Sequence, residues 1–162
     1  MNQPLAIILM GSKSDLEYCQ KIADTCQKFG IETTMRIASA HKTAARLLEI
    51  LAAYETDPRP KVYITVAGRS NALSGMADAS VSAPVIACPP SSSSFGGADI
   101  YSSLRMPSGV APLVILEPEN AALAVAKIFG QSNPEVLAKV KTYQEEHRQR
   151  LYTADEDLND RE

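Results

Sequence analysis

Three short polar loops hold most of the residues in this chain that could do chemistry. They read Gly11-Ser12-Lys13-Ser14-Asp15, Ser39-Ala40-His41-Lys42 and Ala67-Gly68-Arg69-Ser70-Asn71, and each follows an apolar, strand-like run. Hydroxyls, backbone N–H groups and cations suit a phosphate or carboxylate, and an imidazole carries a proton near neutral pH. If the loops meet, they would form a pocket for an anionic metabolite.

His41 is the candidate for proton transfer because it lies in one of these loops. The other histidine, His147, lies on the stripe of a predicted helix among charged residues, where a structural role is expected. One loop histidine and no clustered cysteines do not make a metal ligand set, so no metal is predicted. His41 is therefore predicted to act as a general base or acid.

The other polar residues of the loops also have simpler interpretations. Ser14 and Asp15 could only cap a helix, and Lys42 and Arg69 could be solvated surface charges. The chain has no Walker A, GxGxxG or GxSxG motif, so neither the usual nucleotide fingerprints nor a serine nucleophile is indicated. Their position beside His41 and among glycines favours anion binding.

Composition predicts one globular domain over residues 1–162. The chain is 45% hydrophobic and 22% charged, with a net charge of -3 and a pI near 5.4, which argues against a nucleic-acid partner. The apolar run 5–10 is too short for a signal peptide or a membrane span, so no membrane partner is expected. Three cysteines without a CxxC pair favour a reducing, cytoplasmic location.

Strand-like and helical runs alternate along the chain. Strands are predicted at 5–10, 31–37, 61–66, 84–88 and 113–116; helices are predicted at 15–29, from about 43, at 120–129, and from 134 onward. Ser14 to Glu17 has the S-x-x-E form of a capping box for the first helix. This alternation predicts a three-layer α/β fold with a parallel sheet and a long C-terminal helix.

Three segments depart from this simple pattern. Residues 89–97 form a long loop typical of a lid, with Ser91 to Gly97 as its mobile part. Residues 120–129 are apolar on every side, so we expect burial on both faces and a symmetric homo-oligomer. Residues 155–162 are acidic and are expected to be a disordered tail.

The motifs together resemble the PurE family of purine biosynthesis. The resemblance rests on residues 10–15, 39–42, 67–76 and 103–109 and runs from about Leu5 to Leu151. It implies a flavodoxin-like fold, a homo-oligomer (octamer or tetramer), and carboxylation of the imidazole carbon of aminoimidazole ribonucleotide.

Two features favour the direct carboxylase class of that family. The mutase class typically has arginine where this chain has Lys42, and a histidine-containing loop where this chain has residues 69–75 without histidine. The carboxylase class uses carbon dioxide and needs no ATP, biotin, metal or other cofactor. A mutase acting on the N-carboxy isomer is the alternative, and a non-catalytic nucleotide-binding module on the same fold is a more distant one.

The resemblance also implies roles for individual residues. Ser12 and Asp15 would hold the phosphoribosyl group, with Ser39 and Lys42 nearby, and Gly68, Arg69 and Ser70 would stabilise the developing carboxylate. The aminoimidazole ring behaves as an enamine and attacks carbon dioxide itself. His41 would then remove the ring proton, and the loop Ser91 to Gly97 would exclude water.

Overall fold

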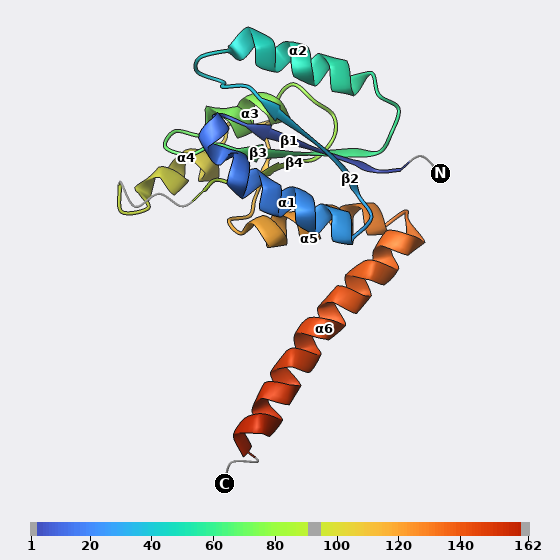
Figure 1. Cartoon of the computed structure of the whole chain (residues 1–162). Helices are drawn as coiled ribbons and strands as arrows, with labels where there is room; N and C mark the ends of the chain where they lie inside the picture. Colours follow the sequence, from blue (N-terminus) through green and yellow to red (C-terminus); the bar gives the residue numbers. More distant parts are fainter. Residues whose placement is uncertain (1–2, 91–94, 160–162) are drawn as a thin grey trace.

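A five-stranded parallel sheet forms the centre of the structure (Figure 1), which is a computed structural model describing residues 3–90 and 95–159. The strand order is β2-β1-β3-β4-β5, as in flavodoxin-like sheets. The strands are β1 (Leu5–Met10), β2 (Glu32–Ile37), β3 (Lys61–Val66), β4 (Val85–Ala87) and β5 (Leu113–Val114). All five predicted strands are confirmed, with β4 and β5 shorter than predicted.

Helices connect the strands and cover both faces of the sheet. The α-helices are α1 (Leu16–Lys28), α2 (Ala44–Glu55), α3 (Ala72–Asp78), α4 (Tyr101–Leu104), α5 (Pro118–Gly130) and α6 (Pro134–Asn159), and the short 3-10 helices are η1 (Lys13–Asp15) and η2 (Ala98–Ile100). Figure 1 shows α1 and α5 on one face and α2 on the other. The predicted three-layer α/β architecture is therefore confirmed. No helix within the described residues has both the length and the apolar character needed to cross a bilayer.

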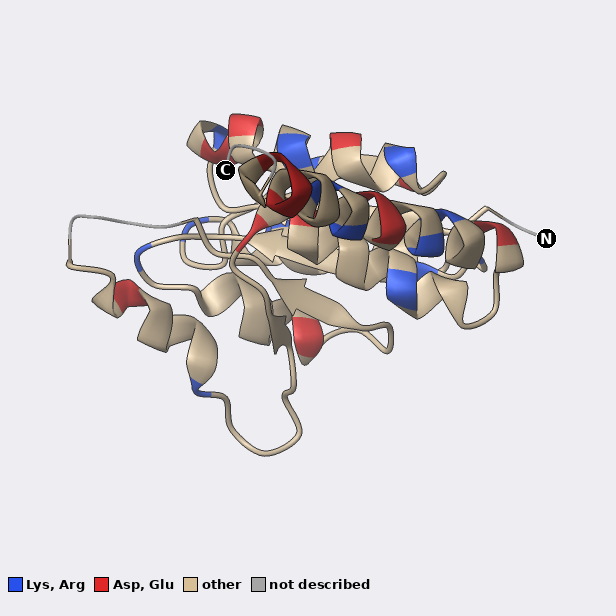
Figure 2. Ribbon diagram, turned by 90° about the horizontal axis from the view of Figure 1, so that it is seen from below, with Lys and Arg blue, Asp and Glu red and all other residues tan. Residues whose placement is uncertain are grey.

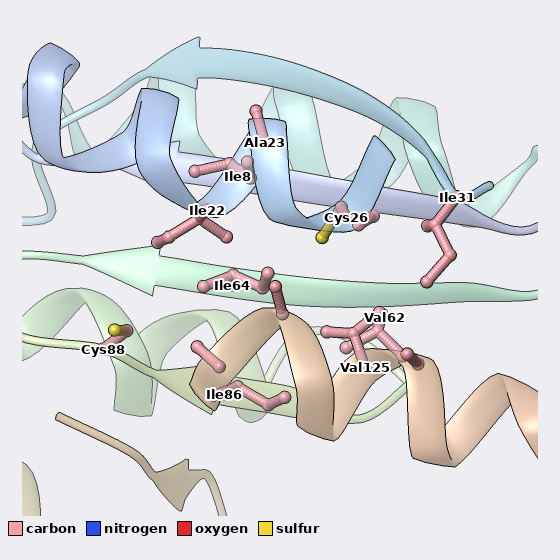
Figure 3. Close-up of a cluster of buried hydrophobic side chains, with 14 of the residues drawn as sticks. Ile8, Ile22, Ala23, Cys26, Ile31, Val62, Ile64, Ile86, Cys88 and Val125 are labelled. Carbon is pink, nitrogen blue, oxygen red and sulfur yellow. The ribbon is translucent and has the colours of Figure 1, made fainter. Parts of the chain in front are cut away.

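The strand β1 is buried throughout and divides the core into two layers. Ala6, Ile8 and Met10 pack in the layer with α1 and α5, whereas Leu5, Ile7 and Leu9 pack in the layer with α2 and α3. Figure 3 shows the first layer, where Ile22 and Cys26 of α1 and Val125 of α5 meet the sheet. This two-sided burial explains why β1 is a continuous apolar run.

The first helix does not begin with the predicted capping box. The hydroxyl of Ser12 accepts a hydrogen bond from the backbone N–H of Ser14 at 3.2 Å and caps η1, and α1 then starts at Leu16 without a side-chain cap. The prediction for Ser14 and Glu17 was therefore wrong. Because of this extra 3-10 turn, the side chain that caps the start of the helical segment is that of Ser12 rather than that of Ser14.

The helix α5 is covered mainly by its own chain. Ala121, Ala122, Val125, Ala126 and Phe129 are buried, and Leu123, Ala124 and Ile128 are partly buried against the same cluster. Asn120 and Lys127 remain exposed. Much of the predicted burial is thus achieved by α1, the sheet and the start of α6, without a second subunit.

The last helix packs on the body only at its start. Asn133 caps it by accepting hydrogen bonds from the N–H groups of Glu135 (3.1 Å) and Val136 (3.2 Å), and Val136 and Val140 are buried. Leu151 is 72% exposed, because α6 then leaves the body (Figure 1). Figure 2 shows acidic and basic residues interspersed over the helices.

The helix α6 continues to Asn159, so residues 155–159 are helical where a disordered tail was expected. Residues 160–162 lie outside the described residues, as do residues 91–94 of the predicted lid. Of that lid, Phe95, Gly96 and Gly97 are described and form an exposed turn.

Candidate active site

The three polar loops meet in one pocket at the carboxyl edge of the sheet. Its volume is about 590 Å³, and it lies where the strand order reverses between β1 and β3, the usual ligand position in such sheets. It is lined by Gly11, Ser12, Ser14, Asp15, Ser39, Ala40, His41, Lys42, Ala67, Gly68, Arg69, Ser70, Leu73 and Pro90. All eight residues predicted for the site are therefore brought together.

The loop after β1 is tied to the loop after β3. The backbone N–H of Gly11 donates to the carbonyl of Val66 at 2.9 Å, and a Cβ on Gly11 would lie 3.5 Å from Cβ of Ala67. Beyond Gly11, the hydroxyl of Ser14 donates to that of Ser12 at 2.9 Å. The hydroxyls of Ser12 and Ser14 thus line the pocket beside the start of a helical segment, an arrangement suited to phosphate.

Among the described residues that line the pocket, Asp15 is the one with a carboxylate. Burial raises the pKa of its carboxyl above the ordinary value of 3.8, and a hydrogen bond from the backbone of Ser12 opposes that rise only in part. Asp15 therefore takes up a proton at a higher pH than an ordinary aspartate does.

The loop that carries His41 is closed by hydrogen bonds between Ser39 and Thr43. The N–H of Thr43 donates to the carbonyl of Ser39 at 2.8 Å, and the N–H of Ser39 donates to the hydroxyl of Thr43 at 2.9 Å. The hydroxyl of Ser39 also accepts from the N–H of Lys42 at 3.2 Å. This tight turn holds His41 and Lys42 side by side at its tip, and both are exposed to solvent.

The loop after β3 contains a backbone conformation that only a few residue types favour. Arg69 has a φ of 62°, in the left-handed region, and it is the only described non-glycine residue with a positive φ. Its neighbour Gly68 has little room for a side chain, since a Cβ there would lie 3.3 Å from Cγ of Pro90. Strain of this kind is typical of functional loops.

Leu73 and Pro90 line the pocket although they were not predicted for it. Leu73 is a buried residue in the first turn of α3 and has no polar signal. Pro90 follows β4, so the rule that loops at the carboxyl edge line the site could have found it. None of residues 103–109, which carry part of the family resemblance, is among the described residues that line the pocket.

The pocket combines the groups needed for an anionic substrate and a proton transfer. Besides His41 it presents the cations of Lys42 and Arg69, several hydroxyls, and glycines that let a ligand approach the backbone. Among the described residues, no three histidine, cysteine or acidic side chains lie close enough to hold a metal ion together.

Comparison with known proteins gives consistent matches over nearly the whole chain. Residues 5–150 match the family described as AIR carboxylase. A phosphoribosylaminoimidazole carboxylase of Archaeoglobus fulgidus is 60% identical over 153 residues, which cover 94% of this chain and 84% of that protein. A phosphoribosylaminoimidazole carboxylase of Treponema denticola is 54% identical over 156 residues, covering 96% of this chain and 98% of that protein.

Solved structures agree with the sequence matches. The crystal structure of Treponema denticola PurE superposes with a TM-score of 0.95 at 54% sequence identity, covering 96% of this chain and 99% of that one. Fold and sequence similarity thus extend together across the strands, the pocket loops and the helices.

Proposed function

Because this chain belongs to the AIR carboxylase family, we propose that its three-loop pocket carboxylates the imidazole carbon of aminoimidazole ribonucleotide with dissolved carbon dioxide. The activity is that of a phosphoribosylaminoimidazole carboxylase in purine biosynthesis, as in the relatives. Because this family consists of enzymes, the alternative of a non-catalytic nucleotide-binding module is no longer favoured. The convergence of His41 with two anion-binding loops in one pocket carries the proposal.

In the proposed binding mode, each loop holds one part of the substrate. Ser12 and Asp15, at the helix start, hold the phosphoribosyl group, with Ser39 and Lys42 beside it. The backbone of Gly68 and the side chains of Arg69 and Ser70 receive the carboxyl group.

The chemistry requires one new bond and one proton transfer. The ring carbon, made nucleophilic by its amino group, forms a bond to the carbon of carbon dioxide, and the electron pair of one C=O bond moves to oxygen. The ring carbon then still carries its hydrogen. His41 accepts that proton, the C–H electrons restore the aromatic ring, and the proton passes to water.

Two features support carbon dioxide, rather than an N-carboxy isomer, as the carboxyl donor. The pocket contains Lys42 at the tip of the second loop, and its third loop has no histidine between Arg69 and Gly75. Both of the relatives described above are named carboxylases. A mutase would also need a place for a carboxyl group on the exocyclic nitrogen.

We also propose a symmetric homo-oligomer, an octamer or tetramer, in the cytoplasm. Leu151 and Leu158 lie on one face of α6, at 72% and 67% exposure, and a second copy of the chain could cover them. Cys19, Cys26 and Cys88 are free and buried, which suits a reducing compartment.

The direct test of the proposed reaction uses the purified full-length protein, aminoimidazole ribonucleotide and carbon dioxide without ATP. We expect formation of the carboxylated ribonucleotide at a rate that rises with carbon dioxide. No product above the protein-free control would refute the proposal.

A further inference from the structure

Buried polar side chains are concentrated beneath one loop of the pocket. In residues 3–90 and 95–159, the buried polar residues are Thr25, Thr65, Asn71, Ser74 and Ser103. All except Thr25 are joined by hydrogen bonds into one network. Buried polar groups are costly unless satisfied, so their grouping at one place calls for a physical reason.

Asn71 is the centre of this network. Its side-chain amide donates to the hydroxyl of Ser103 at 2.9 Å, across 32 residues of sequence, and its carbonyl oxygen accepts from the N–H of Ser74 at 3.1 Å. The hydroxyl of Thr65, on β3, donates to that of Ser74 at 3.1 Å. The network therefore links β3, α3 and α4, of which α3 and α4 lie beside each other (Figure 1).

Ser102 connects the network to the backbone of the pocket loop. Its hydroxyl accepts from the backbone N–H of Asn71 at 2.9 Å and lies 3.3 Å from the carbonyl oxygen of Arg69. It also donates to the carbonyl of Asp99 at 2.7 Å. The N–H after Ser70 is thus held from α4, and the carbonyl before Ser70 lies beside the same hydroxyl, next to the left-handed φ of Arg69.

These contacts lie at a pocket loop with an unusual backbone conformation, so they can do more than stabilise the fold. An arginine in the left-handed region persists only where its surroundings impose that conformation. The contacts that flank it here come from Ser102, at the carbonyl of Arg69 and the N–H of Asn71, and from Ser103, which binds the side chain of Asn71. None of Asn71, Ser102 and Ser103 is among the described residues that line the pocket. They act on a loop whose residues Gly68, Arg69 and Ser70 do line it.

We propose that Asn71, Ser102 and Ser103 are positioning residues that hold the loop of Gly68, Arg69 and Ser70 in the geometry that receives the carboxyl group. This inference rests on the proposed function. Because the ribonucleotide phosphate is assigned to a different loop, loosening this one should impair the use of carbon dioxide more than ribonucleotide binding.

The test compares Ser103→Ala, Asn71→Ala and Ser102→Ala with wild type in the full chain. We expect kcat/KM for carbon dioxide to fall about tenfold to a hundredfold, as for other small misplacements of reacting groups. The KM for the ribonucleotide should stay within about twofold. Ser102→Thr, which keeps the hydroxyl, should restore most of the loss.

Thr25→Ala is the matched control, since Thr25 is equally buried but lies outside the network, on α1. It should lower the thermal midpoint without changing kcat/KM. A double-mutant cycle between Asn71→Ala and Ser103→Ala should show strong non-additivity, because each change removes the same hydrogen bond.

Hydrogen exchange gives a readout that does not depend on activity. The amides of residues 68–71 should exchange at least about tenfold faster in Ser102→Ala than in wild type, with those of α1 unchanged. Unchanged exchange there, or wild-type kcat/KM for carbon dioxide in folded variants, would overturn the inference. If Asn71→Ala and Ser103→Ala do not fold, the comparison of Ser102→Ala with Ser102→Thr tests the inference, because Ser102 is only half-buried. A wild-type protein without activity would refute the proposed function instead, and the exchange result would still decide whether the network holds the loop.

Discussion

Gly68 and Pro90 lie close together in the lining of the pocket, with little room for a side chain on Gly68. A Cβ on Gly68 would lie 3.3 Å from Cγ of Pro90, closer than most side-chain contacts, and 3.7 Å from its Cδ, an ordinary contact distance. After β4 ends at Ala87, the chain continues through the buried residues Cys88 and Pro89 to Pro90. The loop after β3, which we propose receives the carboxyl group, therefore takes part of its position from the loop after β4.

The first prediction follows from this contact. Gly68→Ala should lower kcat/KM for carbon dioxide about tenfold or more, because a rigid proline ring cannot yield and the loop must shift. Steady-state kinetics with varied carbon dioxide measures the effect. Gly130→Ala is the control: its Cβ would lie 3.4 Å from Cα of Leu137, an ordinary contact distance between α5 and α6, so this variant should fold and leave kcat/KM unchanged. Equal kinetic losses in both variants would contradict this prediction.

His41→Asn should fold normally and lose turnover by about a hundredfold to ten-thousandfold. An amide keeps much of the shape and hydrogen bonding of the imidazole but cannot carry the proton. His147→Asn removes the other histidine, on α6, and should keep wild-type turnover. Turnover near the wild-type level in His41→Asn would exclude His41 as the base.

A pH-dependent contribution to stability is expected from Glu55 at the end of α2. Burial opposes its ionisation, but hydrogen bonds from the backbone and side chain of Ser82 and from the hydroxyl of Tyr63 outweigh burial and lower the pKa of Glu55 below its ordinary 4.5. A lowered carboxyl pKa stabilises the fold fully above the unfolded value, and this stabilisation is lost as the pH falls through the folded value.

Glu55→Gln should therefore flatten the loss of unfolding free energy between about pH 5 and pH 3, measured by denaturant titration at each pH. Glu49→Gln, on the same helix, removes only an exposed ion pair with Arg46 and should leave that slope as in wild type. If the unfolding free energy of Glu55→Gln falls with decreasing pH as steeply as that of wild type, Glu55 does not contribute to this pH dependence.

The exposed stripe of α6 predicts how the subunits associate. Leu151→Glu should reduce the mass measured by light scattering, because it places a charge where a second copy would cover an apolar side chain. Thr153→Glu adds the same charge on the opposite face of the helix and should keep the wild-type mass. A wild-type mass of 17.5 kDa at micromolar concentration would refute the oligomer itself.

Local patterns were enough to predict the strands and the convergence of the loops. The run 61–66 is β-branched and bounded by prolines and glycine, and parallel strands place the loops that follow them at one edge. Ser39, His41 and Arg69 could be placed in one pocket for that reason alone.

Features that depend on long-range contacts could not be predicted in this way. The hydrogen bond from Asn71 to Ser103 spans 32 residues, and the left-handed φ occurs at Arg69 rather than at the adjacent glycine. The stripe on α6 has the same period at buried Val140 and exposed Leu151, so periodicity cannot show which part packs on its own chain.

The carboxyl donor is the central claim, and one comparison tests it most directly. Purified protein is supplied with aminoimidazole ribonucleotide and carbon dioxide in one assay, and with the N-carboxy isomer in a second, corrected for the spontaneous breakdown of that isomer. We predict saturable turnover with carbon dioxide and no acceleration by the N-carboxy isomer beyond the carbon dioxide it releases. Faster, saturable use of the N-carboxy isomer, with only weak use of carbon dioxide, would contradict the account and identify a mutase.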